Sequence, residues 1–360
     1  MSSLVLSGRA LPLQSGLEPG VQRVGPLCEL PGLLREHGVR PSMLLKRAGL
    51  SADAFADRDA RIGYAVIARL LDACAAATRC SHFGLLLGSR WRLEHVGLPG
   101  ELAASCATVG EALQAFTSHQ WLNSSGGVAY LHRSAGTTSL GYAVFEPGLK
   151  VGIDQIHDMV IAVGVRMIRE LTGKPGWAPT QVMLSRKKPG DTAPYRRIFG
   201  GPVRFDAEFT AVHFPTSFEA TCVPSADENR RRVLEARLVA AGRESILPRL
   251  RRMIRVAMIF GLTSGDDVAA AMALARRTFN RRLSQYGTTY QQVLEAVRVE
   301  AAQQLLRETA LSIGDIAGAL GYTEPSAFVR AFRRWMSTPP GAWRRQAVES
   351  APDRIPIEPL

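Results

Sequence analysis

The chain has 360 residues, enough for two domains, and its composition, 46% hydrophobic and 21% charged, is ordinary for a soluble protein. No uncharged apolar run approaches the roughly 18–20 residues of a membrane span, so we do not expect a membrane protein. The net charge of +12 is unusual, and residues 230–346, with 20 arginines and nine acidic residues, carry +11 of it.

The first 25 residues lack the basic start and apolar block of a targeting peptide. The cysteines show neither a CxxC pair nor Cys/His ligand spacing, and they are Cys28, Cys74, Cys80, Cys106 and Cys222. Reduced thiols in a cytosol are the simplest account of such an odd-numbered set. We therefore expect a cytoplasmic protein without a metal or another cofactor.

Residues 27–215 predict an α+β domain. Apolar residues at helical spacing and a capping box predict helices at 64–78, 109–121 and 154–171. Runs of β-branched and aromatic residues bounded by turns predict strands at 128–131, 139–145, 180–185, 202–206 and 211–214. The first two strands flank a turn-rich segment and predict a hairpin.

Residues 216–245 predict a linker followed by a connecting helix. This helix, 229–241, is basic and amphipathic, but it is too short for a sustained heptad repeat. Two interpretations stay open: a helix that packs on its own domain, or the seam of a dimer.

Residues 246–346 predict an all-α domain in which one unit occurs twice: a short capped helix, a tight turn and an arginine-bearing helix. The first copy runs from Ser264 to Arg282 and the second from Ser312 to Arg334. A helix of about 20 residues, 289–308, lies between them, and at ~1.5 Å per residue it is ~30 Å long. This length is close to the ~34 Å of one DNA turn.

This pattern indicates two helix-turn-helix units that read DNA. In such a unit the first helix supports the second, which lies in the major groove. Arginine pairs with guanine and asparagine with adenine, each contact being worth roughly 1–3 kcal/mol of discrimination. Other arginines, among them Arg252, are expected to contact phosphate and to weaken binding equally on all sequences when removed.

The same residues resemble the AraC/XylS family of bacterial transcriptional regulators. The resemblance covers residues 250–345 and rests on the segments 275–283, 311–317, 320–322, 325–335 and 340–344. The chain departs from the family pattern at Ala275, Ser337 and Pro339, where the family usually has other small or polar residues. These departures affect helix ends and leave the pattern intact.

The resemblance implies a base-reading face on each unit. The residues expected to bind DNA are Arg276, Arg277, Asn280, Arg281, Ser326, Val329, Arg330 and Arg333. Pro325 and Ala327 stand where other members often carry polar readers, so the second unit is expected to read less. Arg330 has an alternative role in packing or in phosphate binding.

Residues 27–215 more weakly resemble the arabinose-binding-like N-terminal domain of one branch of this family, through segments such as 59–62, 83–85 and 199–206. In that branch the domain binds an effector or dimerises, and effector residues cannot be carried over. Trp121, Tyr130, Tyr142 and Trp177 are candidates to line a ligand pocket, with core packing as the default.

The sequence thus predicts a cytoplasmic bacterial transcription regulator and not an enzyme. Its scattered histidines show no ligand motif, and the adjacent His157 and Asp158 lie in a predicted helix, where a surface or satisfied histidine is expected. The expected partners are double-stranded DNA, RNA polymerase, a small-molecule effector and a second copy of the chain. An activator gated by that effector is the leading hypothesis; the alternative is an N-terminal domain that only dimerises or contacts another protein.

Overall fold

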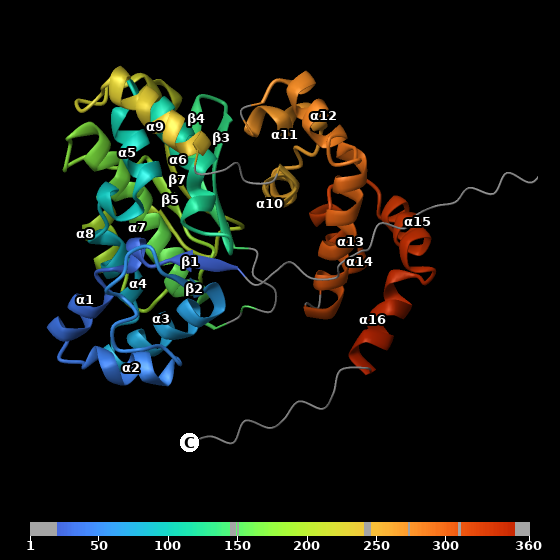
Figure 1. Cartoon of the computed structure of the whole chain (residues 1–360). Helices are drawn as coiled ribbons and strands as arrows, with labels where there is room; N and C mark the ends of the chain where they lie inside the picture. The colour runs from blue at the N-terminus through green and yellow to red at the C-terminus, as the bar shows by residue number, and fades with distance from the viewer. Residues whose placement is uncertain are drawn as a thin grey trace, which may run out of the picture.

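The computed structural model describes residues 20–144, 149, 151–240, 246–272, 274–308 and 311–349. An α+β part precedes an all-helical part, as the sequence predicts (Figure 1). The first 19 residues, the segment 241–245 of the expected linker region and part of 145–150 lie outside the described residues.

A five-stranded sheet forms the centre of the N-terminal part, in the order β3-β4-β7-β5-β6. Its strands are β3 (Gly127–Ser134), β4 (Thr137–Val144), β5 (Gln181–Met183), β6 (Val203–Arg204) and β7 (Thr210–Pro215). β3, β4, β7 and β5 pair antiparallel, and β5 pairs parallel with β6. The predicted hairpin is β3-β4, in which Tyr130 lies opposite Gly141.

Helices cover one face of this sheet. They are α4 (Phe83–Ser89), α5 (Leu98–Ser105), α6 (Val109–His119), α7 (Ile153–Thr172) and α8 (Ala193–Phe199). Thr108 caps α6 as expected, because its side chain accepts a hydrogen bond from the backbone N–H of Glu111. Leu140, Met167 and Phe214 belong to the core between this face and its helices.

A second, two-stranded sheet and a helical subdomain lie at the start of the described chain. The elements are β1 (Val21–Arg23), α1 (Leu30–Glu36), α2 (Pro41–Arg47), β2 (Arg61–Gly63) and α3 (Tyr64–Thr78). Short 3-10 turns lie at Gly25–Leu27, Leu93–Val96, Gln120–Leu122 and Thr216–Ala220. The sequence does not predict the β1-β2 pair, α5 or α8.

The connecting helix α9 (Glu228–Ala240) packs on the N-terminal domain. Leu234 and Leu238 are buried with Leu102 of α5 in one small cluster. Val233, on the other side of the helix, is 60% exposed. Of the two interpretations of this helix, packing on its own domain or the seam of a dimer, the first describes the arrangement within one chain.

The helical domain contains the two predicted units, each opened by a serine cap. Its helices are α10 (Ile246–Ile259), α11 (Gly265–Ala271), α12 (Arg276–Ser284), α13 (Tyr290–Glu308), α14 (Ile313–Ala319), α15 (Pro325–Met336) and α16 (Pro340–Glu349). The Ser264 hydroxyl accepts from the backbone N–H of Asp267, and the Ser312 hydroxyl accepts from that of Asp315. Phe279, Phe328 and Phe332 are fully buried in the core that holds the two units together.

The open face of the five-stranded sheet meets this helical domain. Val128 and Tyr130 of β3 and Ala143 of β4 belong to the same buried cluster as Leu250 and Ile254 of α10. In Figure 1, α10 lies between the sheet and α13. The two parts of the chain are therefore packed against each other through β3 and α10.

Candidate nucleic-acid interface

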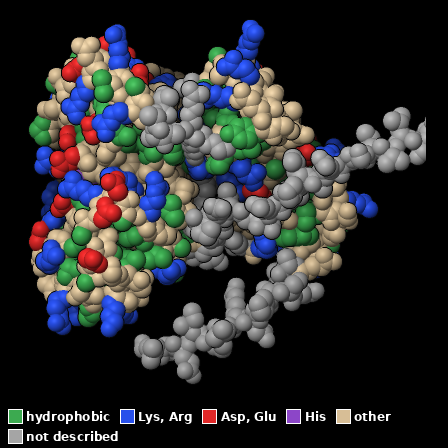
Figure 2. All heavy atoms as spheres, in the orientation of Figure 1, with side chains coloured by type: hydrophobic (Ala, Val, Ile, Leu, Met, Phe, Trp, Pro, Cys, Tyr) green, Lys and Arg blue, Asp and Glu red, His purple; other side chains and the backbone are tan. Residues whose placement is uncertain are grey.

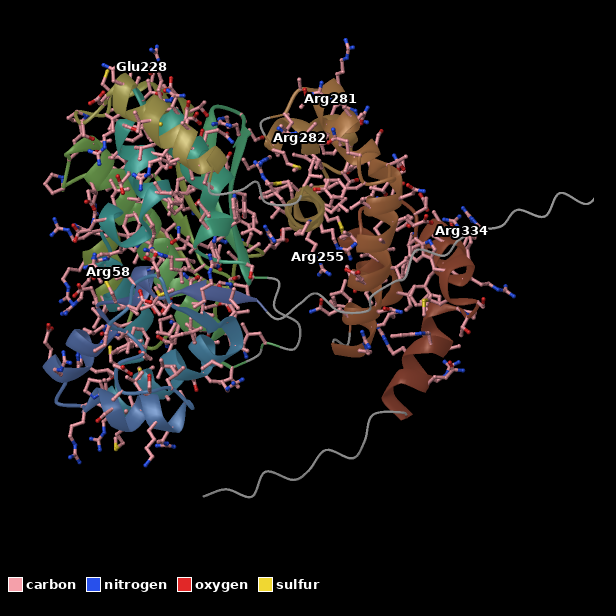
Figure 3. All side chains as sticks on the ribbon, viewed as in Figure 1. Arg58, Glu228, Arg255, Arg281, Arg282 and Arg334 are labelled. Carbon is pink, nitrogen blue, oxygen red and sulfur yellow. The ribbon has the colours of Figure 1, made fainter. Side chains whose placement is uncertain are left out.

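The first recognition helix, α12, has one buried and one exposed side. Phe279 and Leu283 face the core, at 0% and 1% exposure, while Arg277, Asn280 and Arg281 are exposed. Within the described chain, the side chains of these three exposed residues have no intramolecular hydrogen bond or ion pair. Basic side chains project from the end of the domain that carries α12 (Figure 2), where Arg281 lies (Figure 3).

Arg276 differs from its neighbours, because its guanidinium lies back against its own unit. It stands 3.5 Å from the Asp266 carboxylate and lies over the rings of Phe279 and Tyr290, at 5.6 and 5.9 Å from their centroids. A guanidinium held this way stabilises the contact between α11 and α12. It is placed less favourably for reading a base than Arg277 and Arg281.

The second recognition helix, α15, presents Ser326, Arg330 and Arg333 as exposed side chains and Val329 as a half-buried one. The next arginine, Arg334, instead donates a hydrogen bond of 2.7 Å to Glu295 of α13. The Trp335 indole donates to the same carboxylate oxygen. These hydrogen bonds hold the pKa of Glu295 below its usual value and fix α15 to the long helix.

Two arginines that the sequence reasoning missed hold the two turns in equivalent ways. Arg249 of α10 donates to the carbonyl of Met272, the C-cap residue that follows α11. Arg298 of α13 donates to the carbonyl of Leu320, the C-cap residue that follows α14. An unpaired carbonyl at a helix C-terminus is a natural partner for arginine, so each guanidinium fixes the first helix of its unit to the preceding helix.

Arg252, expected to contact phosphate, lies elsewhere in this structure. It is half-buried on α10, where burial lowers its pKa, and it lies near the Tyr142 hydroxyl of the N-terminal domain. Arg251 and Arg255, on the same helix, both pair with Glu300 of α13. The arginines of α10 therefore join elements of the protein and are not part of the surface formed by α12 and α15.

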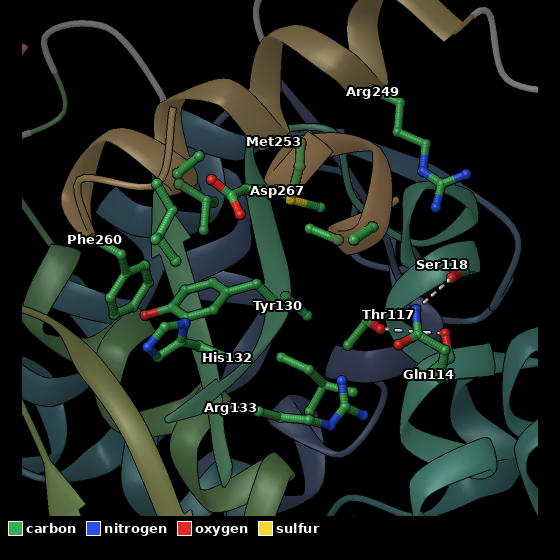
Figure 4. A pocket seen from close by; sticks show the side chains of 17 residues that line it. Gln114, Thr117, Ser118, Tyr130, His132, Arg133, Arg249, Met253, Phe260 and Asp267 are labelled. Carbon is green, nitrogen blue, oxygen red and sulfur yellow. Dashed lines mark hydrogen bonds between the residues drawn. The ribbon is translucent and has the colours of Figure 1, made fainter. Parts of the chain in front are cut away.

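A cavity of about 260 Å³ lies between the two parts of the chain. β3 and α6 form one wall, and α10 and α11 form the other. Tyr130, His132 and Phe260 gather at one end, while Arg249, Gln114 and Ser118 lie at the other (Figure 4).

A second chamber of about 80 Å³ lies on the opposite face of the same strand. Trp91, Phe116, Tyr142 and Gly164 are among its lining residues, and none of the lining residues is ionisable at neutral pH. Of the aromatic residues considered as pocket-lining candidates, Tyr130 lines the first cavity and Tyr142 lines the second. Trp177 instead packs against Phe214 and Phe218.

Two groups of polar residues have structural explanations. The half-buried His157, whose pKa is lowered to about 4 by desolvation, lies 3.1 Å from the Ser185 hydroxyl, as expected of a satisfied histidine. Cys28, Glu29 and His95 bring possible ligand atoms within 4.8 Å of one another. However, His95 Nδ1 accepts the backbone N–H of Arg92, so the neutral ring keeps its proton on Nε2 and offers no free nitrogen.

None of the described helices is both long and apolar enough to cross a membrane. Two family models match the chain. The first, described as the arabinose-binding domain of AraC transcription regulators at their N-terminus, matches residues 38–221. The second, a helix-turn-helix domain, matches residues 268–346.

Similar proteins include the transcriptional regulator VirS of Mycobacterium tuberculosis, which is 28% identical over 319 residues, covering 87% of this chain and 93% of the relative. The ornithine utilization regulator of Pseudomonas aeruginosa is 27% identical over 321 residues, with coverage of 87% and 93%. The crystal structure of the regulator CdpR from the same organism has a TM-score of 0.45 and 23% identity, and covers 89% of this chain and 96% of its own.

The family and these relatives are transcription regulators, not enzymes. Two helix-turn-helix units with exposed arginines on their second helices form the DNA-binding part, behind an α+β domain that matches the first family model. This chain is a DNA-binding transcription regulator that belongs to the AraC family.

Proposed function

We propose that α12 and α15 enter successive major-groove segments of one operator. The observation that supports this most directly is that both helices turn exposed arginines outward, while their buried sides belong to the core cluster that they share with α10 and α13. The 19 residues of α13 between the units span ~28 Å at ~1.5 Å per residue, close to one DNA turn. On α12, Arg277, Asn280 and Arg281 read bases.

On α15, Ser326, Val329 and Arg330 face the bases and Arg333 contacts phosphate. The exposed Arg330 favours base reading over its alternative role in packing. Arg276, held by Asp266, contributes by positioning α12.

The N-terminal domain, we propose, gates this activity by binding a small effector. The support is that cavities lie on both faces of β3, the strand that also packs on α10 of the DNA-binding domain. The alternative, a domain that only dimerises or contacts another protein, gives no role to these cavities. We further propose a homodimer that acts in the bacterial cytoplasm as an activator and contacts RNA polymerase.

Base reading is tested with the full chain and the DNA fragments that it retains from a genomic library. Arg281→Ala is expected to relax the preference at one base position, at a cost of roughly 1–3 kcal/mol on the preferred site. Binding of every single-base operator variant is measured by fluorescence anisotropy at fixed salt.

Arg333→Ala serves as the matched control, since a phosphate contact carries no sequence information. It should weaken all operator variants by the same factor. A uniform loss for Arg281→Ala would remove this residue from the base-reading set. Failure of the wild-type chain to prefer any sequence would overturn the proposed function itself.

A further inference from the structure

Phe260, the residue after α10, inserts its ring among aromatic side chains of the sheet. Its ring is stacked on His132 of β3, with centroids 4.3 Å apart and planes at 13°. It meets Tyr130 edge-on at 5.4 Å and Phe209 at 5.5 Å. We call Tyr130, His132, Phe209 and His213, all of the N-terminal domain, the aromatic socket.

The register of the strands places three of the socket residues on one face. Tyr130 and His132 are two positions apart on β3, and His213 of β7 lies in the same row as His132 across Ser139 of β4. Phe209 precedes β7 and stacks on His213, with ring centroids 6.0 Å apart. A Cβ at Gly141 would stand 2.4 Å from the Tyr130 hydroxyl oxygen, so the absence of a side chain there lets the tyrosine ring lie across β4. The socket is thus formed by residues of the N-terminal domain alone.

Two polar atoms of the socket have no partner among the described residues. They are the hydroxyl of Tyr130, which is 3% exposed, and Nε2 of His213, and both atoms are buried. Phe260 is apolar and cannot pair with either of them. A buried unpaired polar group is costly, so its presence calls for an explanation such as a ligand that satisfies it.

The socket also has an access route. Tyr130, His132 and Phe260 form one end of the cavity of about 260 Å³ between the domains (Figure 4). A cavity of about 150 Å³ can hold benzene, so this space is large enough for a ring with substituents. No lysine, arginine or carboxylate belongs to the socket. The charged residues of the cavity wall already have partners: Arg133 pairs with Glu219, Arg249 donates to the Met272 carbonyl, and Asp267 accepts from the Ser264 hydroxyl.

We propose that the aromatic socket is a binding site for an uncharged aromatic compound that carries a ring hydroxyl or carbonyl, and that Phe260 occupies this site in the ligand-free protein. The ring of the ligand replaces the ring of Phe260 on His132, and its polar group pairs with the Tyr130 hydroxyl and with His213 Nε2. A charged ligand is disfavoured because the socket offers no opposite charge.

Occupation of the socket by such a compound weakens the contact of α10 with the sheet, since it removes the Phe260 stacking that adds to the buried cluster of Val128, Tyr130 and Ala143 with α10. The DNA-binding domain then changes its position relative to the N-terminal domain. This inference rests on the proposed gating by an effector, for which it names the site and the chemical class.

The first test uses the full chain with phenol and acetophenone as probes, and the dissociation constant is obtained from the dependence of the unfolding temperature on probe concentration. Phe260→Ala removes the internal competitor. It is expected to bind phenol about tenfold more tightly or better, because the open socket is a minor state in the wild type. Phe218→Ala, which removes a half-buried ring stacked on Trp177 away from the socket, should leave the affinity unchanged.

If Phe260 only stabilises the core, the opposite result is expected. Phe260→Ala would then lower the unfolding temperature as Phe218→Ala does, without any gain in phenol affinity, and the proposal would be overturned. The proposal would also be overturned if Gly164→Leu, which fills the second chamber, abolished phenol binding while Phe260→Ala left the phenol affinity unchanged.

The second test uses Tyr130→Phe, which keeps the ring and removes the unpaired hydroxyl. The variant is expected to have a raised unfolding temperature and about five- to tenfold weaker binding of phenol, with binding of toluene unchanged. Equal losses for phenol and toluene would contradict the hydrogen bond. Benzoate binding more tightly than phenol would overturn the ligand class.

DNA binding separates this inference from the proposed function. Phe260→Ala without ligand is expected to match the operator affinity of the wild type saturated with phenol. If the wild type binds its operator but no probe binds, the socket proposal fails and the proposed function stands. If no operator binding is found with or without a probe, the proposed function fails.

Discussion

Arg186 brings a guanidinium into the interior of the N-terminal domain, where it pairs with Asp158 of α7. The Tyr195 hydroxyl donates to the same carboxylate, at 2.7 Å. Burial raises the pKa of Asp158, to about 7, and the guanidinium opposes that rise. The three side chains join α7, α8 and the loop after β5, so their role is structural.

Removing one partner of this pair should be costly. Arg186→Met is expected to lower the free energy of unfolding by about 3–5 kcal/mol, because it leaves the Asp158 carboxylate buried without an opposite charge. Arg90→Met, which breaks the more exposed pair with Glu36, should cost much less, because solvent screens this pair. Urea unfolding measures both, and equal costs would show that burial does not decide the effect.

At the residue scale, the sequence predicts which side chains are exposed better than it predicts which residues contact one another. Helical period and the resemblance together assign Arg277, Asn280 and Arg281 to one side of α12, and their exposure agrees. Nothing in the sequence indicates that Arg276 lies on Tyr290, or that Phe260 lies on His132, because each contact joins segments whose relative position depends on the whole fold.

Among the elements, α4 and α7 cross at close range because α4 carries two glycines. A Cβ at Gly84 would stand 2.1 Å from the carbonyl oxygen of Gln155, and one at Gly88 would stand 2.2 Å from that of Met159. At Gly164 of α7 a Cβ would meet only Leu140, at 3.4 Å, and Val212, at 3.7 Å. Close packing of backbones therefore depends on the glycines of α4 and not on Gly164.

The two helices thus offer a matched pair of substitutions. Gly164→Ala is expected to stabilise the protein by about 0.5–1 kcal/mol, because alanine loses less backbone entropy in a helix and fits the chamber beside it. Gly88→Ala should destabilise it by about 1–3 kcal/mol through overpacking. Calorimetric unfolding gives both values, and a loss at Gly164 would show that the chamber cannot take a methyl group.

The elements of the helical domain could be predicted because their signals are local. Ser264 with Asp267 and Ser312 with Asp315 mark helix starts within a few residues. In the N-terminal domain, β1 and β2 have three residues each and pair across about 40 positions, as Gln22 with Ile62 shows. Strands this short carry no recognisable period, so only the three-dimensional contacts reveal them.

For the whole molecule, positive charge is concentrated toward the C-terminal end. The segment 230–346 carries +11 of the net charge of +12, but α9 at its start packs on the N-terminal domain, and residues 246–346, with 15 arginines and seven acidic residues, carry +8. The exposed arginines of α12 and α15 belong to the helical domain, so phosphate binding, and with it the dependence of affinity on salt, should depend mainly on this domain.

This partition predicts how salt affects DNA binding by the full chain. Arg333→Ala should reduce the slope of log affinity against log salt by about 0.9, the value for one phosphate contact on B-form DNA. Arg40→Ala removes an exposed arginine from the N-terminal domain and should leave the slope unchanged. Titrations at several salt concentrations measure the slopes, and similar reductions would contradict the partition.

The short connection between α9 and α10 has a consequence for sensitivity. α9 ends at Ala240, fixed to α5 through Leu234 and Leu238, and α10 begins at Ile246. Even fully extended, the residues between them span no more than about 20 Å. Phe260 is thus tethered near the socket at an effective concentration on the order of millimolar, against which a ligand must compete. Lengthening this tether would lower the ligand concentration at which the protein responds.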